Sequence, residues 1–273
     1  MATPKTARAL EESPVSRFLA SLPLWLAAVL IVVLPTAAAM SGPVLIRRRF
    51  SLDRLTTNNE IAGFKFATVG VIYAVLLAFA VIVVWERFSS AEAAVIEDAG
   101  AAVTLYRLAA APDPQATSMR GALDRYLAAA IAKDWPQMAV AQSSPEVTQA
   151  LNELYAAMLS LAQDGTRPPA VLVEMFHQLD LVTQARRTRL QLAHGIVPTM
   201  LWTVLILGGV LTVGFTFFFG TRNLEAQVLM TGVLALIVFM GLLVIVSLNH
   251  PFTGSVRIDS EPLQSVLEDF AHR

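Results

Sequence analysis

A group of basic side chains precedes an apolar stretch in the second half of the chain. Arg186, Arg187 and Arg189 stand a few residues before an uncharged stretch that begins at Gly195. Arginines in such a place commonly contact lipid headgroups. The sharper hypothesis is that they attract anions to a pore, because rings of charge select ions in channels. We therefore treat the three arginines as candidate pore-mouth charges, with headgroup contact as the plainer alternative.

Acidic side chains follow an earlier uncharged stretch. Glu92, Glu97 and Asp98 come shortly after its end. Two interpretations apply to such a group, an exposed helix face in water or an acidic vestibule that binds cations. We predict the first, because isolated acids on a helix are usually solvated.

The motifs of common catalytic and cofactor sites are absent from the sequence. It has no cysteine, no glycine-rich phosphate loop, no dinucleotide-binding glycine motif and no His-Glu-x-x-His. Its histidines are scattered singly, and a metal site needs several convergent ligands. His177 and His194 are therefore interpreted as surface or interfacial residues. We predict no catalytic residue, no metal site and no cofactor, and we do not expect an enzyme.

A stripe of small residues follows one face of the second uncharged stretch. Gly63, Ala67, Gly70, Ala74 and Ala78 recur at spacings of three and four residues. Small residues let membrane helices approach closely, so helix packing is the first interpretation. The second is that the stripe lines a narrow pore in an oligomer, and both hold if the second helices surround a shared axis. A weaker face of this kind in the third stretch comprises Gly209, Thr212, Thr216 and Gly220.

The whole chain is poor in charge, and the deficit is concentrated in four stretches. Only 15% of its 273 residues are charged, against about 25% in soluble domains. No charged residue occurs within residues 18–46, 66–85, 195–221 or 226–249. Each stretch reaches the ~20 residues that a helix needs to cross a bilayer, so four transmembrane spans are predicted. The net charge of −1 excludes a strongly basic nucleic-acid binder.

The order of these stretches predicts an all-α integral membrane protein. Four spans extend into an aqueous helical bundle, and an even number of spans puts both tails and the bundle on one side. The predicted regions are a flexible tail at 1–17, spans one and two at 18–85, a water-exposed helical domain at 86–194, spans three and four at 195–249, and a tail with a short amphipathic helix at 250–273.

Helical periodicity continues beyond the second span. Apolar residues recur at three- and four-residue spacing, so one helix is predicted over residues 59–110. Proline interrupts helices, and we predict that Trp135-Pro136 ends a later helix of the bundle. Gly195 and Pro198 predict a kink where the last helix of the bundle enters the third span.

Several stretches resemble one family of bacterial membrane proteins. The most specific is the second-span motif, residues 58–79 with Trp85-Glu86. The others are residues 105–109, 135–138, 185–190 and 251–254. By these residues the chain is similar to the bestrophin-like family, a family of unknown function, over nearly its whole length after the N-terminal tail. Where the family pattern places an acid before the final turn, this chain has Asn249.

The family name implies a distant similarity to bestrophins. Those proteins are pentameric, calcium-regulated anion channels in animals, with non-selective cation-conducting relatives in bacteria. The resemblance implies a homo-oligomeric ion channel of the bacterial inner membrane, a pentamer by resemblance alone, that contacts lipid and conducts inorganic ions. The second span between Gly63 and Phe79 would line its pore. The acids that follow the fourth span, where bestrophins bind calcium, match no calcium loop; they are Asp259, Glu261, Glu268 and Asp269.

A non-conducting scaffold or sensor, whose helical domain binds a partner, is the alternative function.

Two observations predict opposite orientations of the chain in the membrane. The short loops carry Arg47, Arg48, Arg49, Arg54, Lys65 and Arg222, and the tails carry Lys5, Arg8, Arg17, Arg257 and Arg273. Positive charge favours cytoplasmic short loops, whereas the resemblance implies a cytoplasmic helical domain. We follow the resemblance.

Overall fold

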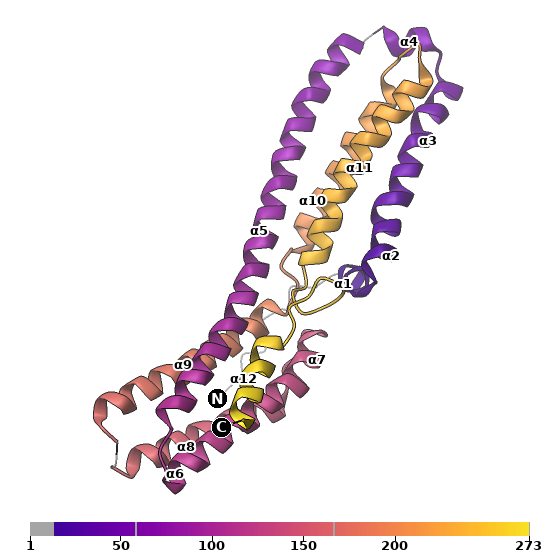
Figure 1. Ribbon diagram of the computed structural model, residues 1–273. Coiled ribbons are helices and arrows are strands. Elements are labelled where there is room, and N and C mark those ends of the chain that lie inside the picture. Colours follow the sequence, from indigo (N-terminus) through magenta and orange to yellow (C-terminus); the bar gives the residue numbers. More distant parts are fainter. Residues whose placement is uncertain (1–13, 58, 166, 273) are drawn as a thin grey trace, which may run out of the picture. The chain divides into compact units, whose positions relative to one another are not determined.

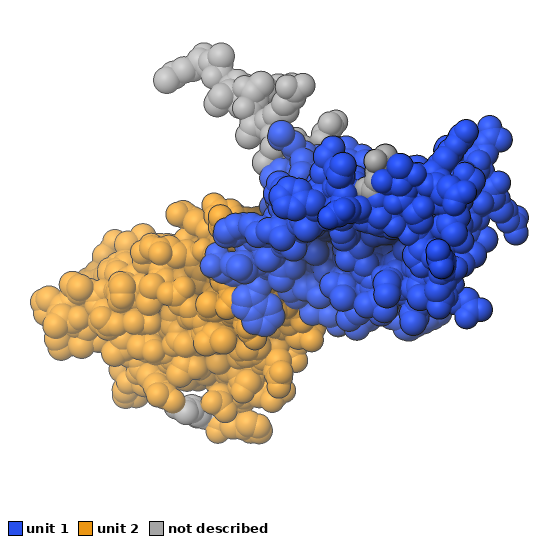
Figure 2. Space-filling model, turned by 90° about the horizontal axis from the view of Figure 1, so that it is seen from above, with its two compact units in different colours: residues 1–86, 195–249, 254–256 blue, residues 87–194, 250–253, 257–273 orange. Residues whose placement is uncertain are grey.

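The computed structural model describes residues 14–57, 59–165 and 167–272, and these residues are almost entirely helical. No β-strand occurs within those ranges, which confirms the all-α prediction. The chain divides into two compact units, which are coloured separately in Figure 2. Unit 1 comprises residues 1–86, 195–249 and 254–256, and unit 2 comprises residues 87–194, 250–253 and 257–273.

The first apolar stretch of unit 1 folds as two helical pieces. Helix α1 (Pro14–Ser21) ends before Pro23. Helix α2 (Leu24–Ala28), a π-helical turn (Val29–Val33) and α3 (Leu34–Arg49) then follow without interruption. Pro23 is extended, with a ψ of 139°, and it precedes the first helical residue. The part of this stretch that could cross a membrane therefore begins at Leu24.

Three more helices are long and apolar enough to cross a membrane. They are α5 (Asn59–Leu108), α10 (Thr199–Phe215), which a 3₁₀ turn extends to Phe218, and α11 (Leu224–Leu248). Together with Leu24–Arg49 they make four candidate spans among the described residues, as the sequence predicts. Helix α4 (Leu52–Thr56) lies between α3 and α5 in the chain, and Figure 1 shows α3 and α11 side by side in unit 1.

Glycines allow close helix contacts inside unit 1. A Cβ atom on Gly232 of α11 would lie 2.9 Å from the Met40 side chain of α3. A Cβ atom on Gly241 would lie 2.8 Å from Leu77 of α5. Other large apolar side chains of these helices are exposed, such as Met200 at 80%. Extensive exposed apolar surface is typical of helices that meet lipid or other membrane helices.

Unit 2 is a helical bundle with one apolar core. Residues 87–108 of α5 join α6 (Pro114–Ala129), α8 (Pro145–Gln163), α9 (Pro169–Leu192) and α12 (Glu261–Ala271). Each helix contributes buried apolar side chains to the same cluster. The C-terminal helix α12 packs against α6, and its apolar face is buried, as the predicted amphipathic pattern requires.

Polar side chains start two of these helices. The Asp113 carboxylate accepts a hydrogen bond from the main-chain N–H of Ala116 at 2.6 Å, at the start of α6. The Ser144 hydroxyl accepts one from Val147 at the start of α8. Both bonds satisfy an N–H group that the first turn of a helix leaves free.

The predicted helix end at Trp135-Pro136 is wrong. Helix α6 continues through a π-helical turn (Ala130–Asp134) into α7 (Trp135–Met138). A proline inside an α-helix clashes with the carbonyl group four residues earlier. The wider π turn changes the hydrogen-bond register just before Pro136, so the chain accepts the proline without leaving the helical path.

The predicted kink at Gly195 and Pro198 is a complete break. Helix α9 ends at Leu192, and α10 begins only at Thr199. Pro198 is extended, with a ψ of 148°, and precedes the first helical residue. Because proline also disfavours the helical conformation for the residue before it, the helix stops here instead of bending.

Candidate functional site

The small-residue stripe of the second span is not packed inside the chain. The buried face of this part of α5 carries Tyr73, Ala80 and Val84. Ala67, Ala74 and Ala78 are exposed, whereas Gly63 and Gly70 are half-buried. A Cβ atom on Gly70 would meet nothing within 4 Å. The stripe is therefore a surface of small residues beside the face that packs in unit 1.

The weaker face of the third span packs inside unit 1. Gly209 and Thr212 are buried, and a Cβ atom on Gly209 would lie 2.9 Å from the Tyr73 hydroxyl oxygen. The Thr216 hydroxyl lies 3.3 Å from that of Thr231 in α11. A Cβ atom on Gly220 would lie 2.7 Å from the main-chain nitrogen of Thr56. This face therefore makes internal helix contacts.

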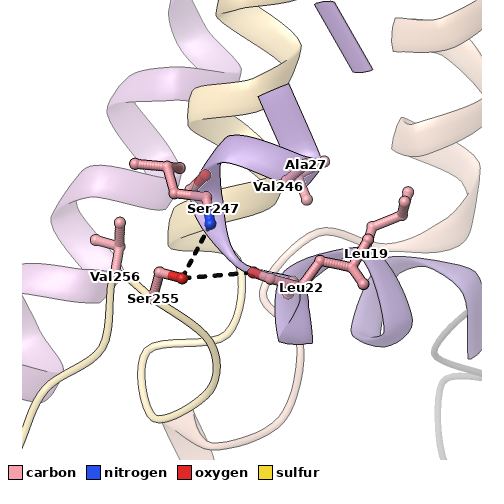
Figure 3. A pocket seen from close by; sticks show the side chains of 9 residues that line it. Leu19, Leu22, Ala27, Val246, Ser247, Ser255 and Val256 are labelled. Atoms are coloured by element: carbon pink, nitrogen blue, oxygen red, sulfur yellow. Dashed lines mark hydrogen bonds between the residues drawn. The ribbon is translucent and has the colours of Figure 1, made fainter. Parts of the chain in front are cut away.

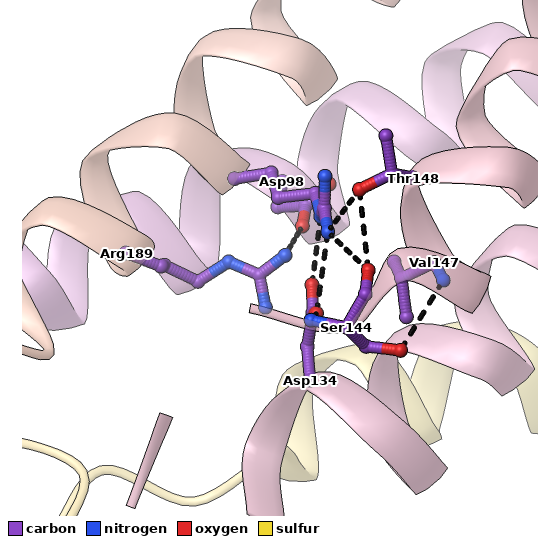
Figure 4. Close-up of polar contacts among 7 residues, drawn as sticks. Asp98, Asp134, Ser144, Val147, Thr148 and Arg189 are labelled. Carbon is purple, nitrogen blue, oxygen red and sulfur yellow. Dashed lines mark hydrogen bonds and ion pairs between the residues drawn. The ribbon is translucent and has the colours of Figure 1, made fainter. Parts of the chain in front are cut away.

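Two of the three candidate pore-mouth arginines lie in the core of unit 2. Arg186 of α9 is 6% exposed and meets Asp134, which is fully buried in the π-helical turn. Arg186 donates to both carboxylate oxygens of Asp134, at 2.7 and 3.2 Å. It also donates to the Ser144 carbonyl and the Thr148 hydroxyl. The Asp134 carboxylate and the Arg186 guanidinium are thus joined by two hydrogen bonds, and Figure 4 shows Asp134 within this network.

Arg189 makes a second buried ion pair with far fewer bonds. Its Nη2 atom donates to Asp98 Oδ2 at 2.6 Å, and both side chains have no exposed surface. The guanidinium carbon lies 4.7 Å from the centre of the Trp135 ring, a cation–π contact. Arg189 Nε and Nη1 and Asp98 Oδ1 are buried without a hydrogen-bond partner in the described part of the chain. Figure 4 shows the pair beside the Asp134 network.

Burial determines the electrostatics of Asp98, which lies in unit 2 after the uncharged stretch of α5. Burial raises the pKa of Asp98 to about 6, although the attraction of Arg189 opposes that rise. Burial also raises the pKa of Tyr126, whose side chain is fully buried nearby. The two groups affect each other's pKa, because the nearby Tyr126 hydroxyl lowers the pKa of Asp98 and the Asp98 charge raises that of Tyr126.

The prediction of a solvated acidic face after the second span is right for two of its three residues. Glu92 and Glu97 are exposed, but Asp98 is fully buried. Arg187 is exposed on α9, between its two buried neighbours. One turn of a helix thus presents some charges to water and others to the core.

The structure brings no metal ligands together in the parts of the chain that it describes. His177 and His194 are exposed, which fits the surface roles predicted for them. Asn249, which stands where the family pattern has an acid, is buried. Its side-chain oxygen accepts hydrogen bonds from the main-chain N–H groups of Ile196 and Val197, at 3.0 and 2.8 Å.

Asp134 is the residue of the buried charged cluster that sequence reasoning missed altogether. It lies in a helix next to Trp135, and neither periodicity nor any motif distinguishes it from an exposed acid. The one available signal was Pro136, because a proline within a helical pattern often accompanies an irregular turn. Such turns frequently lie at functional positions.

A small cavity in unit 1 lies where the chain returns after the fourth span. Its lining includes Leu22, Ala27 and Val246, and Figure 3 shows these side chains around Ser255. The Ser255 hydroxyl accepts a hydrogen bond from the main-chain N–H of Leu24 and donates one to the Leu22 carbonyl, at 3.1 and 3.4 Å. The serine therefore fixes the turn between α1 and α2.

Comparison with known proteins adds evidence on the family. A family model described as Bestrophin-like domain matches residues 33–263 of the chain. A search of curated proteins by sequence finds no match.

Solved structures with the same fold are similar in architecture and distant in sequence. A crystal structure of a bacterial bestrophin homolog from Klebsiella pneumoniae, carrying a single mutation, superposes with a TM-score of 0.71 at 13% identity, covering 88% of this chain and 98% of that one. Another crystal structure of that homolog gives 0.70 at 14% identity over 88% and 97%. At these identities the likeness establishes the fold alone.

Proposed function

The chain belongs to the bestrophin-like family, and on this basis we propose that it forms a passive ion channel in a bacterial inner membrane. Copies of the chain would assemble around a shared axis in the bilayer, and the second span of each copy would line the pore. No cofactor is needed for such conduction, and no catalytic reaction is proposed. The channel would conduct inorganic ions.

The observation that carries the proposal is the exposed stripe on α5. Three of its five residues are exposed, and a Cβ atom on Gly70 would meet nothing within 4 Å in the described part of the chain. The stripe lies next to the face of α5 that packs in unit 1. In the membrane, small residues are favoured where helices or a narrow passage come close. An oligomer with α5 at its centre would use this surface, either between neighbouring second spans or along the pore.

The bulky residues of the same helix support this arrangement. Phe64, Ile72 and Phe79 are exposed at 78%, 64% and 65%. Ile72 and Phe79 lie on the side of α5 away from the stripe, so with the stripe at the pore they would face lipid or neighbouring copies of the chain. The span carries no ionisable group between Phe66 and Trp85, which fits passive conduction better than pumping, because coupled transporters place such groups inside the membrane.

Ion flux into liposomes containing only this protein tests the proposal. We expect flux of small inorganic ions together with an oligomeric mass in detergent. Gly70→Leu should change the flux several-fold, because the larger side chain would narrow a pore lined by the stripe. Val75→Leu is the matched control, because Val75 lies on α5 outside the stripe and is already exposed and apolar.

Two results would contradict the channel. One is the absence of flux for a range of cations and anions together with a monomeric mass. The other is an equal effect of Gly70→Leu and Val75→Leu on a measurable flux. That result would mean that the stripe does not line the pore. The first result would leave a scaffold or sensor as the function to examine.

Arg187 is the arginine that we retain as a pore-mouth charge. Arg186 and Arg189 are neutralised by aspartates, whereas Arg187 is exposed and makes no ion pair among the described residues. We expect Arg187→Gln to lower the ratio of anion to cation permeability without lowering stability. A permeability ratio unchanged from that of the unmodified protein would mean that Arg187 does not lie on the ion path.

We place the helical domain in the cytoplasm, as in the bestrophins that the chain resembles. The arginine-rich short loops would then face the periplasm, against the usual bias of positive charge. A reporter fused to the C-terminus tests this orientation. Activity of a reporter that works only outside the cytoplasm would overturn it.

A further inference from the structure

The two buried ion pairs of unit 2 are not equivalent. Asp134 receives two hydrogen bonds from Arg186, and its Oδ1 also accepts one from the main-chain N–H of Ser144 at 3.1 Å. Arg189 donates one hydrogen bond to Asp98 Oδ2, and Asp98 Oδ1 is buried without a hydrogen-bond partner among the described residues. A buried charge is stable only when its hydrogen-bonding capacity is used. Asp98 and Arg189 therefore form the weaker point of the core.

All the charged and titratable groups that act on Asp98 come from three elements packed around it. Helix α9 provides Arg189 and Arg186, α6 provides Tyr126, and the π-helical turn provides Asp134. The attraction of the arginines is opposed by Asp134 and by full burial. No other carboxylate in this cluster has an oxygen atom that is buried and without a hydrogen-bond partner among the described residues.

We propose that Asp98 is a proton-binding site that works as a pH-sensitive latch between α5 and α9. In the closed state the Asp98 carboxylate holds the Arg189 guanidinium against the Trp135 ring. When the carboxylate takes up one proton from solvent, its attraction for Arg189 is lost. The guanidinium, whose Nε and Nη1 atoms already lack hydrogen-bond partners among the described residues, then has no counter-ion and moves away from Trp135 toward water.

The protonation equilibrium lies in a range that a cell can reach. Burial raises the pKa of Asp98 to about 6. Ordinary aspartates titrate near 3.9, where they would respond only to strong acid.

Trp135 offers a direct readout, because it is the only tryptophan in unit 2. A variant in which Trp25, Trp85 and Trp202 are replaced by phenylalanine reports Trp135 emission alone. We expect its emission to follow a one-proton transition with a midpoint near pH 6, because Arg189 leaves the indole face on protonation. Asp98→Asn in this background should lose the transition and show the low-pH emission throughout.

A matched control isolates Asp98 from its surroundings. Glu97→Gln removes the neighbouring exposed carboxylate of the same helix and should leave the transition unchanged. If Asp98→Asn does not fold, the double variant Asp98→Asn with Arg189→Met removes both charges together, which buried pairs tolerate better than the loss of one partner. It should fold and show no transition.

Two results would overturn the latch. One is Trp135 emission that does not change between about pH 4.5 and 7.5, the range around the raised pKa. The other is a transition that persists in Asp98→Asn or in the double variant, since another group would then be titrating.

An effect on conduction rests on the proposed channel function. Asp98 and the stripe lie on one continuous helix, α5. The ion flux should therefore differ severalfold between pH values below and above the midpoint of the latch. Asp98→Asn at neutral pH should match the unmodified protein at low pH. Absence of flux at every pH would count against the channel, whereas the fluorescence transition would still test the latch.

Discussion

Tyr73 in the second span donates a hydrogen bond to the main-chain carbonyl oxygen of Leu205 in the third span, with 3.1 Å between the two oxygen atoms. The tyrosine ring lies directly over the glycines of α10. A Cβ atom on Gly208 would come within 2.7 Å of it. Two spans that are far apart in sequence are therefore held together by one buried hydrogen bond and by the absence of a side chain.

Gly208→Ala should destabilise this contact. The added methyl group has to displace the Tyr73 ring, which its hydrogen bond holds in place, and overpacking typically costs about 1–3 kcal/mol. Gly214→Ala in the same helix is the matched control, because a Cβ atom there meets nothing within 4 Å. It should be neutral or slightly stabilising, since alanine favours helix. Thermal unfolding in detergent measures both, and equal midpoints would contradict the close contact.

Asp134→Ala should be among the most damaging single changes in unit 2. It leaves Arg186 buried without its counter-ion, and breaking a buried pair in this way costs about 3–5 kcal/mol. The control is Glu146→Gln, which removes an exposed ion pair with Lys133 at 3.4 Å and should cost roughly 0–1 kcal/mol. Urea or thermal unfolding compares the two. A small effect of Asp134→Ala would mean that Arg186 finds another partner.

Asp113 should stabilise the start of α6 both through its capping hydrogen bond and through its negative charge. Hydrogen bonding from Ala116 is the largest cause that lowers its pKa, and Arg167, which donates to Oδ2 at 3.0 Å, adds to it. Because the folded-state pKa lies below the ordinary value, this contribution is present above about pH 3.8 and is lost as the pH falls through the lowered pKa.

Asp113→Asn keeps a capping side chain and removes the charge. We expect it to unfold at a slightly lower temperature than the unmodified protein at neutral pH, and at a similar temperature in strong acid. Asp113→Ala removes the cap as well and should be less stable at neutral pH than Asp113→Asn. The reverse order of the two variants would contradict the capping role.

Gly254 should be intolerant of any side chain. Its φ is +85°, and a Cβ atom would lie 2.0 Å from the Ala20 carbonyl oxygen. Gly165 shares a positive φ of +67° but has open space around its Cα. Gly165→Ala therefore measures the backbone strain alone, about 1–2 kcal/mol, and Gly254→Ala should cost clearly more. Equal losses of thermal stability would show that the loop moves away from Ala20.

The sequence predicts the elements of this fold well where the signal is local. Four uncharged stretches of spanning length give the four candidate spans, and uninterrupted periodicity gives a helix to within two residues of the observed end of α5 at Leu108. These features depend on neighbours a few residues apart. The spacing of small residues identifies the stripe on α5 as a set, but its position on the surface of unit 1 depends on which face of α5 packs against α10 and α11.

The charged core of unit 2 could not be predicted from the sequence. Asp98 follows two exposed glutamates on the same helix, and its partner Arg189 is 91 residues away. The spacing of apolar residues shows which face of a helix is apolar. It cannot show that an acid at the edge of that face forms an ion pair with a basic residue of another helix. The interpretation of Arg186 and Arg189 as exposed charges had the same weakness.

The breaks of the helices were harder to predict than the helices themselves. Pro136 is accommodated by a π-helical turn, whereas Pro198 ends the helical path before α10. The same residue type has opposite effects because the surrounding register differs. A proline in a helical pattern marks an irregularity but does not say which kind.

The order of the buried charges along the chain affects how the protein can be made. Asp98 and Asp134 leave the ribosome before Arg189 and Arg186, by 91 and 52 residues. Until α9 has been synthesised, neither aspartate has the cation that its burial requires. The core of unit 2 can therefore close only when the nascent chain has reached α9, just before α10 emerges. Completion of the bundle and delivery of the last two spans to the membrane become nearly simultaneous events of translation.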